Sequence, residues 1–322
     1  MISVNSFVKR GSTLRWIWLA IAIAIFAALP LCVSTGWVSV VSEMLILAIA
    51  TSSLNLLMGY TGLVSFGPAG LYAVGAYATA LLIVRAGAPF GLAFIAGPII
   101  TAMVSVIVGW FCVRRTAIYF ALLTLAFSQL IHTVIFKWYS FTGGADGIVG
   151  IPVPSFLFSI NNYYYFTLAC TVVCLLALWV IVNSPFGKAL QVIRENPERA
   201  AFIGINVRRY QLIAFVIHGF FLGAAGSLFC GFSHSVFPTF AHWMKAIDMI
   251  IACLLGGMFN FFGPVVGSIA YTFLNKIIIN FTEYWPLVLG TIVVLLVLFL
   301  RGGMAGFISE KFIAIAERGE KS

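Results

Sequence analysis

The sequence predicts an all-α polytopic membrane protein with about ten transmembrane passages, some of them broken helices. Three observations lead to this prediction. Hydrophobic residues make up 62% of the chain and charged residues only 8%, too few to cover the surface of a soluble domain. The apolar residues fall into runs of about 20, the length of a helix that crosses a bilayer. The basic residues gather in the short segments between these runs.

The apolar runs define the domain organisation. We expect a cytoplasmic N-terminal segment at residues 1–15, a transmembrane domain at 16–300 and a cytoplasmic tail at 301–322. The first run lacks a small-residue cleavage pattern and is expected to be a retained span. The expected passages are residues 16–34, 37–58, 63–84, 90–113, 118–136, 163–182, 212–232, 246–259, 265–281 and 286–300.

The positions of the cations set the number of passages. A net charge of +9 could indicate nucleic-acid binding, but the positive-inside bias explains cations in short loops without nucleic acid. Ten passages place fourteen of the 18 Lys and Arg residues, and both termini, in the cytoplasm. Nine passages would leave the four cations after residue 300 on the outside, against that bias.

The longest polar interruption spans residues 184–211 and carries seven charged side chains. Asn196 before Pro197 is a good N-cap followed by proline at the first helical position. Glu198 then lies in the first turn, where the helix dipole favours an acid, and Gly204 is placed to end the helix. A capped helix between two spans is typical of a docking element for a cytoplasmic partner. An ordinary basic loop is the alternative.

Two Gly-Pro breaks interrupt the apolar sequence, at Ser65-Phe-Gly-Pro68 and at Phe261-Phe-Gly-Pro264. Broken helices at membrane depth are tolerated only where the backbone lines a cavity or packs on protein, and in transporters they often mark the substrate path. Close helix packing through small residues is the alternative. The candidate pathway residues are Asn55, Gly59, Tyr60, Gly62, Ser65, Gly67, Pro68, Gly257, Asn260, Gly263 and Pro264.

Catalytic motifs are missing from the sequence. It contains no phosphate-binding loop, no H-E-x-x-H and no G-x-S-x-G, and its six cysteines show no zinc-type spacing. We therefore expect no enzyme, no catalytic residues and no metal site. The polar residues within spans are Glu43, Asn55, Gln129, His132, His218 and Asp248. A secondary transporter or channel would need an ion-coupling acid, for which Glu43 and Asp248 are the candidates, although both can be placed near span ends.

Several motifs resemble one known family. The stretch from Leu54 to Tyr77, the Leu123–Phe127 and Thr142–Ile148 segments, and the stretch from Gly187 to Tyr210 are similar to the M-type permease subunit of branched-chain amino-acid ABC transporters. The resemblance runs from about residue 37 to residue 308.

Two positions depart from that family's pattern. Glu198, Ala200 and Gly204 match the family's E-A-A-x-x-x-G element, with Arg199 in place of the first alanine. Pro68 stands where relatives commonly carry histidine or glutamine, which puts in doubt any substrate contact by that side chain.

The resemblance implies a type II-like ABC importer permease in the bacterial inner membrane. Such a subunit forms half of a translocation pathway with an H-type permease, above two cytoplasmic ATPase subunits that bind ATP and Mg, and receives substrate from a periplasmic binding protein. No cofactor is expected on this chain. Branched-chain or related hydrophobic amino acids are the implied substrates, and urea, amides or other amino acids are the alternative. The implied ATPase-coupling residues are Arg194, Glu195, Asn196, Pro197, Glu198, Arg199, Ala200, Gly204 and Asn206.

Overall fold

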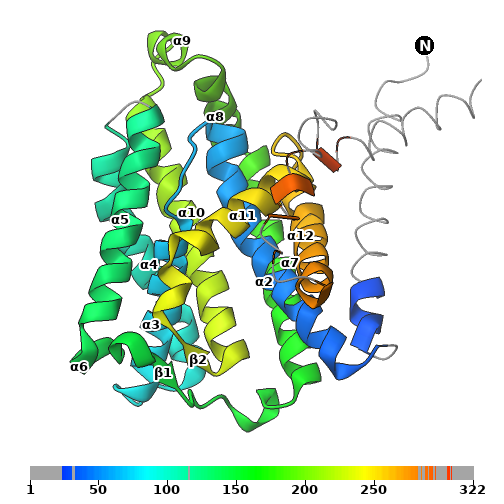
Figure 1. The fold of residues 1–322 in the computed structure, drawn as a ribbon. Helices are drawn as coiled ribbons and strands as arrows, with labels where there is room; N and C mark the ends of the chain where they lie inside the picture. Colours follow the sequence, from blue (N-terminus) through cyan, green and yellow to red (C-terminus); the bar gives the residue numbers. More distant parts are fainter. Residues whose placement is uncertain are drawn as a thin grey trace, which may run out of the picture.

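The computed structural model describes residues 24–30, 33–114 and 117–281, and isolated positions between 284 and 306. These residues form a bundle of long helices, which confirms the predicted fold class (Figure 1). The segment 1–15, most of the first and last expected passages and most of the tail at 301–322 lie outside the described residues.

The long helices follow the predicted apolar runs. They are α2 (Thr35–Asn55, continued by the π-turn η1, Leu56–Thr61), α3 (Pro68–Val84), α4 (Phe90–Cys112), α5 (Ala117–Lys137), α7 (Ile160–Asn183), α10 (Val207–Ser233), α11 (Trp243–Gly256) and α12 (Gly263–Phe281). Five of these spans are long and apolar enough to cross a membrane on their own, whereas α3, α11 and α12 are shorter or less apolar. The broken helices expected from the sequence are thus present.

Short elements connect the long helices. They are α6 (Tyr139–Thr142), η2 (Gly144–Asp146), β1 (Ile148–Val149), η3 (Ser155–Leu157), α8 (Pro185–Glu195), α9 (Pro197–Phe202), β2 (Ser235–Val236) and η4 (Pro238–Ala241). Strands β1 and β2 pair antiparallel, with Ile148 opposite Val236. Figure 1 shows α9 at one end of the bundle, called here the α9 end, and β1, β2 and α6 at the opposite end, called the β end.

Three predicted boundaries need correction. The seventh passage was expected to begin at residue 212, but α10 begins at Val207, inside the polar segment 184–211. The third passage was expected to begin at residue 63, but α3 begins at Pro68 because Gly62, with φ of +76°, turns the chain out of η1 and residues 62–67 are not helical. Gly67 and Pro68 then take the N-cap and first helical positions, as expected. The eighth passage lies at Trp243–Gly256, three residues earlier than predicted.

Helix α2 lies at the centre of the bundle. In its most apolar stretch 89% of the residues are buried, against 28% in α5 and in α7. It packs on α7, α10, α11 and α12. By contrast, α4 exposes an apolar stripe at helical spacing, with Met103 and Ile107 each 62% exposed. Such a surface is unfavourable in water and suits lipid or a second membrane subunit.

Glycines bring α3 and α4 close to α10. A Cβ at Gly75 of α3 would approach the backbone of Gly223 in α10 too closely, and a Cβ at Gly219 would overlap the Ser105 side chain of α4. The Thr79 hydroxyl donates a hydrogen bond of 2.8 Å to Ser227 across the α3–α10 contact. The small residues that follow the first Gly-Pro break therefore serve close helix packing, the alternative that the sequence left open.

Replacing Gly75 with leucine should force α3 and α10 apart. Because overpacking typically costs about 1–3 kcal/mol, we expect a lower thermal midpoint and a smaller folded fraction in detergent. Gly91→Leu is the matched control, since no atom lies within 4 Å of a Cβ at that position of α4. Thermal unfolding followed by size-exclusion fluorescence measures both variants, and equal midpoints would contradict the packing role of Gly75.

Candidate functional site

Helix α8 fixes the polar segment to the bundle. The Ser184 hydroxyl accepts a hydrogen bond of 3.4 Å from the Gly187 amide and caps the helix. Leu190 and Ile193 point into the main apolar core and are almost fully buried, at 0% and 1% exposure. This amphipathic helix is therefore part of the folded body, and a displacement of α8 must move the residues that pack beneath it.

Helix α9 has the caps that the sequence predicts. The Asn196 side-chain oxygen accepts a hydrogen bond of 3.0 Å from the Arg199 amide, and Pro197 is the first helical residue. At the other end the amides of Gly204 and Ile205 donate to the carbonyls of Ala201 and Ala200, both at 3.0 Å. Gly204 has φ of +89°, the left-handed conformation that this double hydrogen bond requires. The helix therefore has fixed ends although it is only six residues long.

The outer surface of α9 is apolar at its end. Phe202 is 90% exposed and Ile203 is 71% exposed, whereas Ala200 is fully buried. Glu198 and Arg199 are exposed on the same helix. Sequence analysis missed Phe202 and Ile203. Two large apolar residues at the end of a short capped helix, in an otherwise polar segment, were the pattern that could have indicated them.

Arg194 points inward rather than toward solvent. Its guanidinium Nη1 donates a hydrogen bond to the carbonyl oxygen of Gly59, and its Cζ lies 5.4 Å from the centre of the Phe259 ring. A Cβ at Gly62 would lie 2.9 Å from the Arg194 Cγ. Arg194 therefore joins α8 to the first break and to the loop before the second.

The end of α2 and η1 meet the second Gly-Pro break, whereas the first break packs on α5, where the Phe66 and Gly70 amides donate to the Thr124 and Ser128 hydroxyls. The Asn55 side-chain amide donates a hydrogen bond of 3.4 Å to the Asn260 carbonyl, and the Thr51 hydroxyl donates one of 3.2 Å to the Pro264 carbonyl. A Cβ at Gly59 would overlap both Asn55 and the carbonyl of Met258. Residues 55–59 thus lie beside residues 257–264. Together with the segment that continues to Pro68, these residues are called here the paired breaks. The paired breaks contain all the candidate pathway residues; that they line a pathway remains a prediction.

A π-turn precedes the first break. In η1 the Thr61 hydroxyl donates a hydrogen bond of 2.8 Å to the Leu56 carbonyl. The Ser65 side chain is buried and accepts a hydrogen bond of 3.3 Å from the Gly67 amide, and Tyr60 is also buried. π-Turns are rare and occur often at functional sites. The altered backbone at Leu56–Thr61 was not predicted, because no residue type marks a π-turn.

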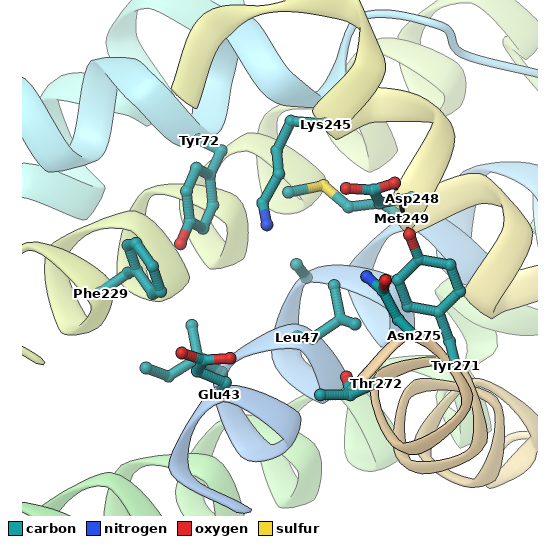
Figure 2. Close-up of a pocket in the computed structure, with 12 residues that line it drawn as sticks. Glu43, Leu47, Tyr72, Phe229, Lys245, Asp248, Met249, Tyr271, Thr272 and Asn275 are labelled. Atoms are coloured by element: carbon teal, nitrogen blue, oxygen red, sulfur yellow. Dashed lines mark hydrogen bonds between the residues drawn. The ribbon is translucent and has the colours of Figure 1, made fainter. Parts of the chain in front are cut away.

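The intramembrane acids and histidines separate into different environments. His218 is fully buried and shares a hydrogen bond of 3.1 Å with Ser53, and the His132 ring lies against that of His242. Glu43 and Asp248, which the sequence left near span ends, both line one partly open cavity (Figure 2). Among the described residues, no three His, Cys, Asp or Glu side chains gather in a group that could hold a metal ion.

Comparison with known sequences gives the family. A family described as the permease component of branched-chain amino acid transport systems matches residues 36–300, most of the chain. The chain belongs to this family. The match covers the paired breaks, α8, α9 and the cavity, so these features lie within the family's shared domain.

Relatives of this permease include the high-affinity branched-chain amino acid permease LivM of Escherichia coli (strain K12). The two are 28% identical, over 91% of this chain and 76% of that protein. LivM of Salmonella typhimurium is 27% identical with the same coverage. The galactose/methyl galactoside import permease MglC of Haemophilus influenzae is 28% identical, but over only 47% of this chain and 51% of its own length. No solved structure matches the permease.

The cap of α9 can be tested alone in the permease. Asn196→Ala removes the acceptor of the Arg199 amide, and losing an N-cap costs about 0.5–2 kcal/mol. We therefore expect amide hydrogen exchange across α9 to accelerate by roughly 2- to 30-fold. Asn183→Ala, which removes a side-chain bond at the end of α7, is the control and should leave α9 exchange unchanged. Equal exchange in both variants would show that Asn196 does not hold the helix.

Proposed function

We propose that this permease is one membrane subunit of an ATP-driven importer of branched-chain amino acids, and that α9 is its docking helix for an ATPase subunit. The observation that carries the proposal is the exposed apolar end of a helix that is capped at both ends. Phe202 and Ile203 place a large apolar surface in water at the α9 end of the bundle. Buried aromatic and aliphatic anchors of this kind dominate binding at protein interfaces.

The charges support a cytoplasmic position for the α9 end. Among the described residues, five exposed cations lie there, namely Arg114, Lys188, Arg199, Arg208 and Arg209. The β end holds Arg85 and Lys137 together with Asp146. An excess of Lys and Arg marks cytoplasmic loops. This orientation, with both termini in the cytoplasm of a bacterial inner membrane, puts α9 where ATP is available.

The proposed importer needs several other protein chains besides this permease. The sequence carries no phosphate-binding loop, so ATP and Mg would bind to two ATPase subunits on the cytoplasmic side. An H-type permease would complete the pathway, and a periplasmic binding protein would deliver substrate to the β end. The names of the LivM relatives, which describe transport-system permease components, support this assembly.

The substrate proposal also rests on the LivM relatives, which match 91% of the chain, whereas the sugar permeases match less than half of it. Urea, amides and other amino acids are the alternative substrates. A secondary transporter would need no capped docking helix, which is why we favour the importer.

The mechanical link from α9 to the membrane runs through α8. Leu190 and Ile193 hold α8 on the core, and Arg194 ties its end to Gly59 in η1 and to Phe259. If nucleotide-driven closure of the ATPase subunits displaces α9, Arg194 transmits the displacement to the paired breaks. Arg194 therefore acts inside the subunit, whereas Glu198, Arg199, Phe202 and Ile203 face the partner.

Docking through α9 can be tested in the reconstituted importer. Phe202→Ala with Ile203→Ala, Glu198→Lys and Gly204→Val should insert normally but weaken ATPase association. The loss of a hot spot of about 2 kcal/mol corresponds to a roughly 30-fold weaker complex. Uptake and ATP hydrolysis are measured together, with Lys188→Gln on the exposed face of α8 as the control. Wild-type uptake in all the α9 variants would mean that the segment is only a basic connector.

The proposed orientation has its own test. Single cysteines replace Lys188 at the α9 end or Val149 in β1, both exposed, in a background without the six native cysteines. A membrane-impermeant thiol reagent should label the Val149→Cys variant in right-side-out vesicles and the Lys188→Cys variant only in inside-out vesicles. The reverse pattern would place α9 outside the cell and rule out ATPase docking there.

A further inference from the structure

A partly open cavity of about 290 Å³ lies between α2, α3, α10, α11 and α12. This volume is close to the lower limit of ligand pockets, about 300 Å³, and suits a small metabolite. The side chains around it include the charged Glu43, Lys245 and Asp248 and the apolar Ile46, Leu47 and Met249. Its lining thus combines charged, polar and apolar groups from five helices.

Charges of both signs face the cavity. Figure 2 shows the Lys245 ammonium, from α11, and the Glu43 carboxylate, from α2, directed into the same space. Asp248 is the third charged group, and its Oδ1 accepts a hydrogen bond of 2.5 Å from the Tyr271 hydroxyl. All three side chains are partly buried. In the sequence Lys245 is only one of the four cations outside the predicted cytoplasmic segments, and nothing there groups it with the two acids.

Two of these charges have no directly bonded partner among the described residues. Within the part of the chain that the structure describes, neither Glu43 nor Lys245 forms an ion pair or a side-chain hydrogen bond. Lys245 attracts Asp248 only over a longer distance, and its ammonium lies 5.9 Å from the centre of the Phe229 ring. The Asn275 side-chain oxygen is also buried without a hydrogen-bond partner. Charged and polar groups inside a membrane protein are costly unless they are paired. Separated, unpaired charges at one cavity therefore point to a ligand that brings both opposite charges.

The rest of the wall is apolar. Ile46, Leu47 and Met249 line the cavity beside the charged groups, with the Phe229 ring at its side. An α-amino acid with a branched aliphatic side chain has the matching chemistry. Its carboxylate, its ammonium and its apolar side chain are all bonded to one carbon atom, Cα.

The cavity also lies next to the paired breaks. Ala50 lines the cavity, and Asn55, five residues further along α2, contacts the second break. Five residues span about 7.5 Å along the axis of α2. Thr51, beside Ala50, donates its hydrogen bond to Pro264. The paired breaks therefore separate the cavity from the α9 end.

We propose that this cavity is an intramembrane binding site for the zwitterion of an aliphatic α-amino acid. This inference rests on the proposed importer function and adds a site to it. Lys245 binds the substrate carboxylate, Glu43 and Asp248 bind the ammonium, and Ile46, Leu47 and Met249 contact the side chain. The paired breaks form the cytoplasmic gate of the site.

Protection from thiol labelling tests the site directly. Thr272→Cys, in a background without native cysteines, places a thiol at the cavity wall of the complete importer in lipid nanodiscs. A small thiol reagent should label it, and leucine should slow the labelling. Leucinamide, which lacks the carboxylate, and 4-methylpentanoate, which lacks the ammonium, should protect at least 10-fold less well. Lys245→Met and Glu43→Gln should each raise the leucine concentration for half-protection at least 10-fold. The control is Lys137→Met, which replaces an exposed lysine at the end of α5 and should leave that concentration unchanged.

Other outcomes overturn the site. Labelling that leucine does not slow, or a thiol that stays unreactive in every nucleotide state, would show that the cavity binds no amino acid. Equal protection by leucine, leucinamide and 4-methylpentanoate would show an apolar pocket without charge recognition. Leucine uptake by the same wild-type preparation is scored separately. Uptake without protection refutes the site alone, whereas no uptake of leucine, isoleucine or valine refutes the importer function.

Discussion

One arginine side chain connects the two unusual regions of this permease. Arg194 leaves the end of α8, hydrogen-bonds the carbonyl of Gly59 in a π-turn, and places its guanidinium over Phe259. The carbonyls of a broken helix lack their normal helical partners, and at membrane depth each must find another donor. Arg194 supplies one, so the break and the docking segment stabilise each other. Removing the guanidinium would leave a buried carbonyl unpaired and free the end of α8 at once.

This arrangement explains why the breaks are tolerated. Two interrupted helices would expose free backbone groups to lipid if each stood alone. Here they face each other, and Asn55 and Thr51 of α2 donate to the backbone of the second break. Gly59 allows the approach, because a Cβ at this position would overlap the carbonyl oxygen of Met258. The paired breaks are thus held largely by hydrogen bonds to the backbone, whereas α3 and α10 are held by close packing of their glycine backbones as well as by the Thr79–Ser227 hydrogen bond.

The sequence predicted the elements better than their contacts. Apolar runs of bilayer length identify the spans, and cap chemistry at Asn196 and Gly204 identifies α9, because both signals are local. Which face of a span meets which neighbour is not local. Lipid and protein interior are both apolar, so a membrane helix lacks the amphipathic pattern that orients a helix in a soluble protein. For that reason the contact of Asn55 with Asn260, the inward direction of Arg194 and the grouping of Glu43 with Lys245 became visible only in the structure.

The small β1–β2 pair has a mechanical consequence. It fastens the end of α10 to the connection between α5 and α7, with the amides of Gly150 and Ile151 both donating to the His234 carbonyl at 3.0 Å. At its other end α10 follows α9 through the short turn at Gly204. A helix held at one end and pulled at the other acts as a lever with its pivot at the held end. Displacement of α9 would therefore tilt α10, with the largest movement at Val207, the end that follows α9, and the smallest at the β end.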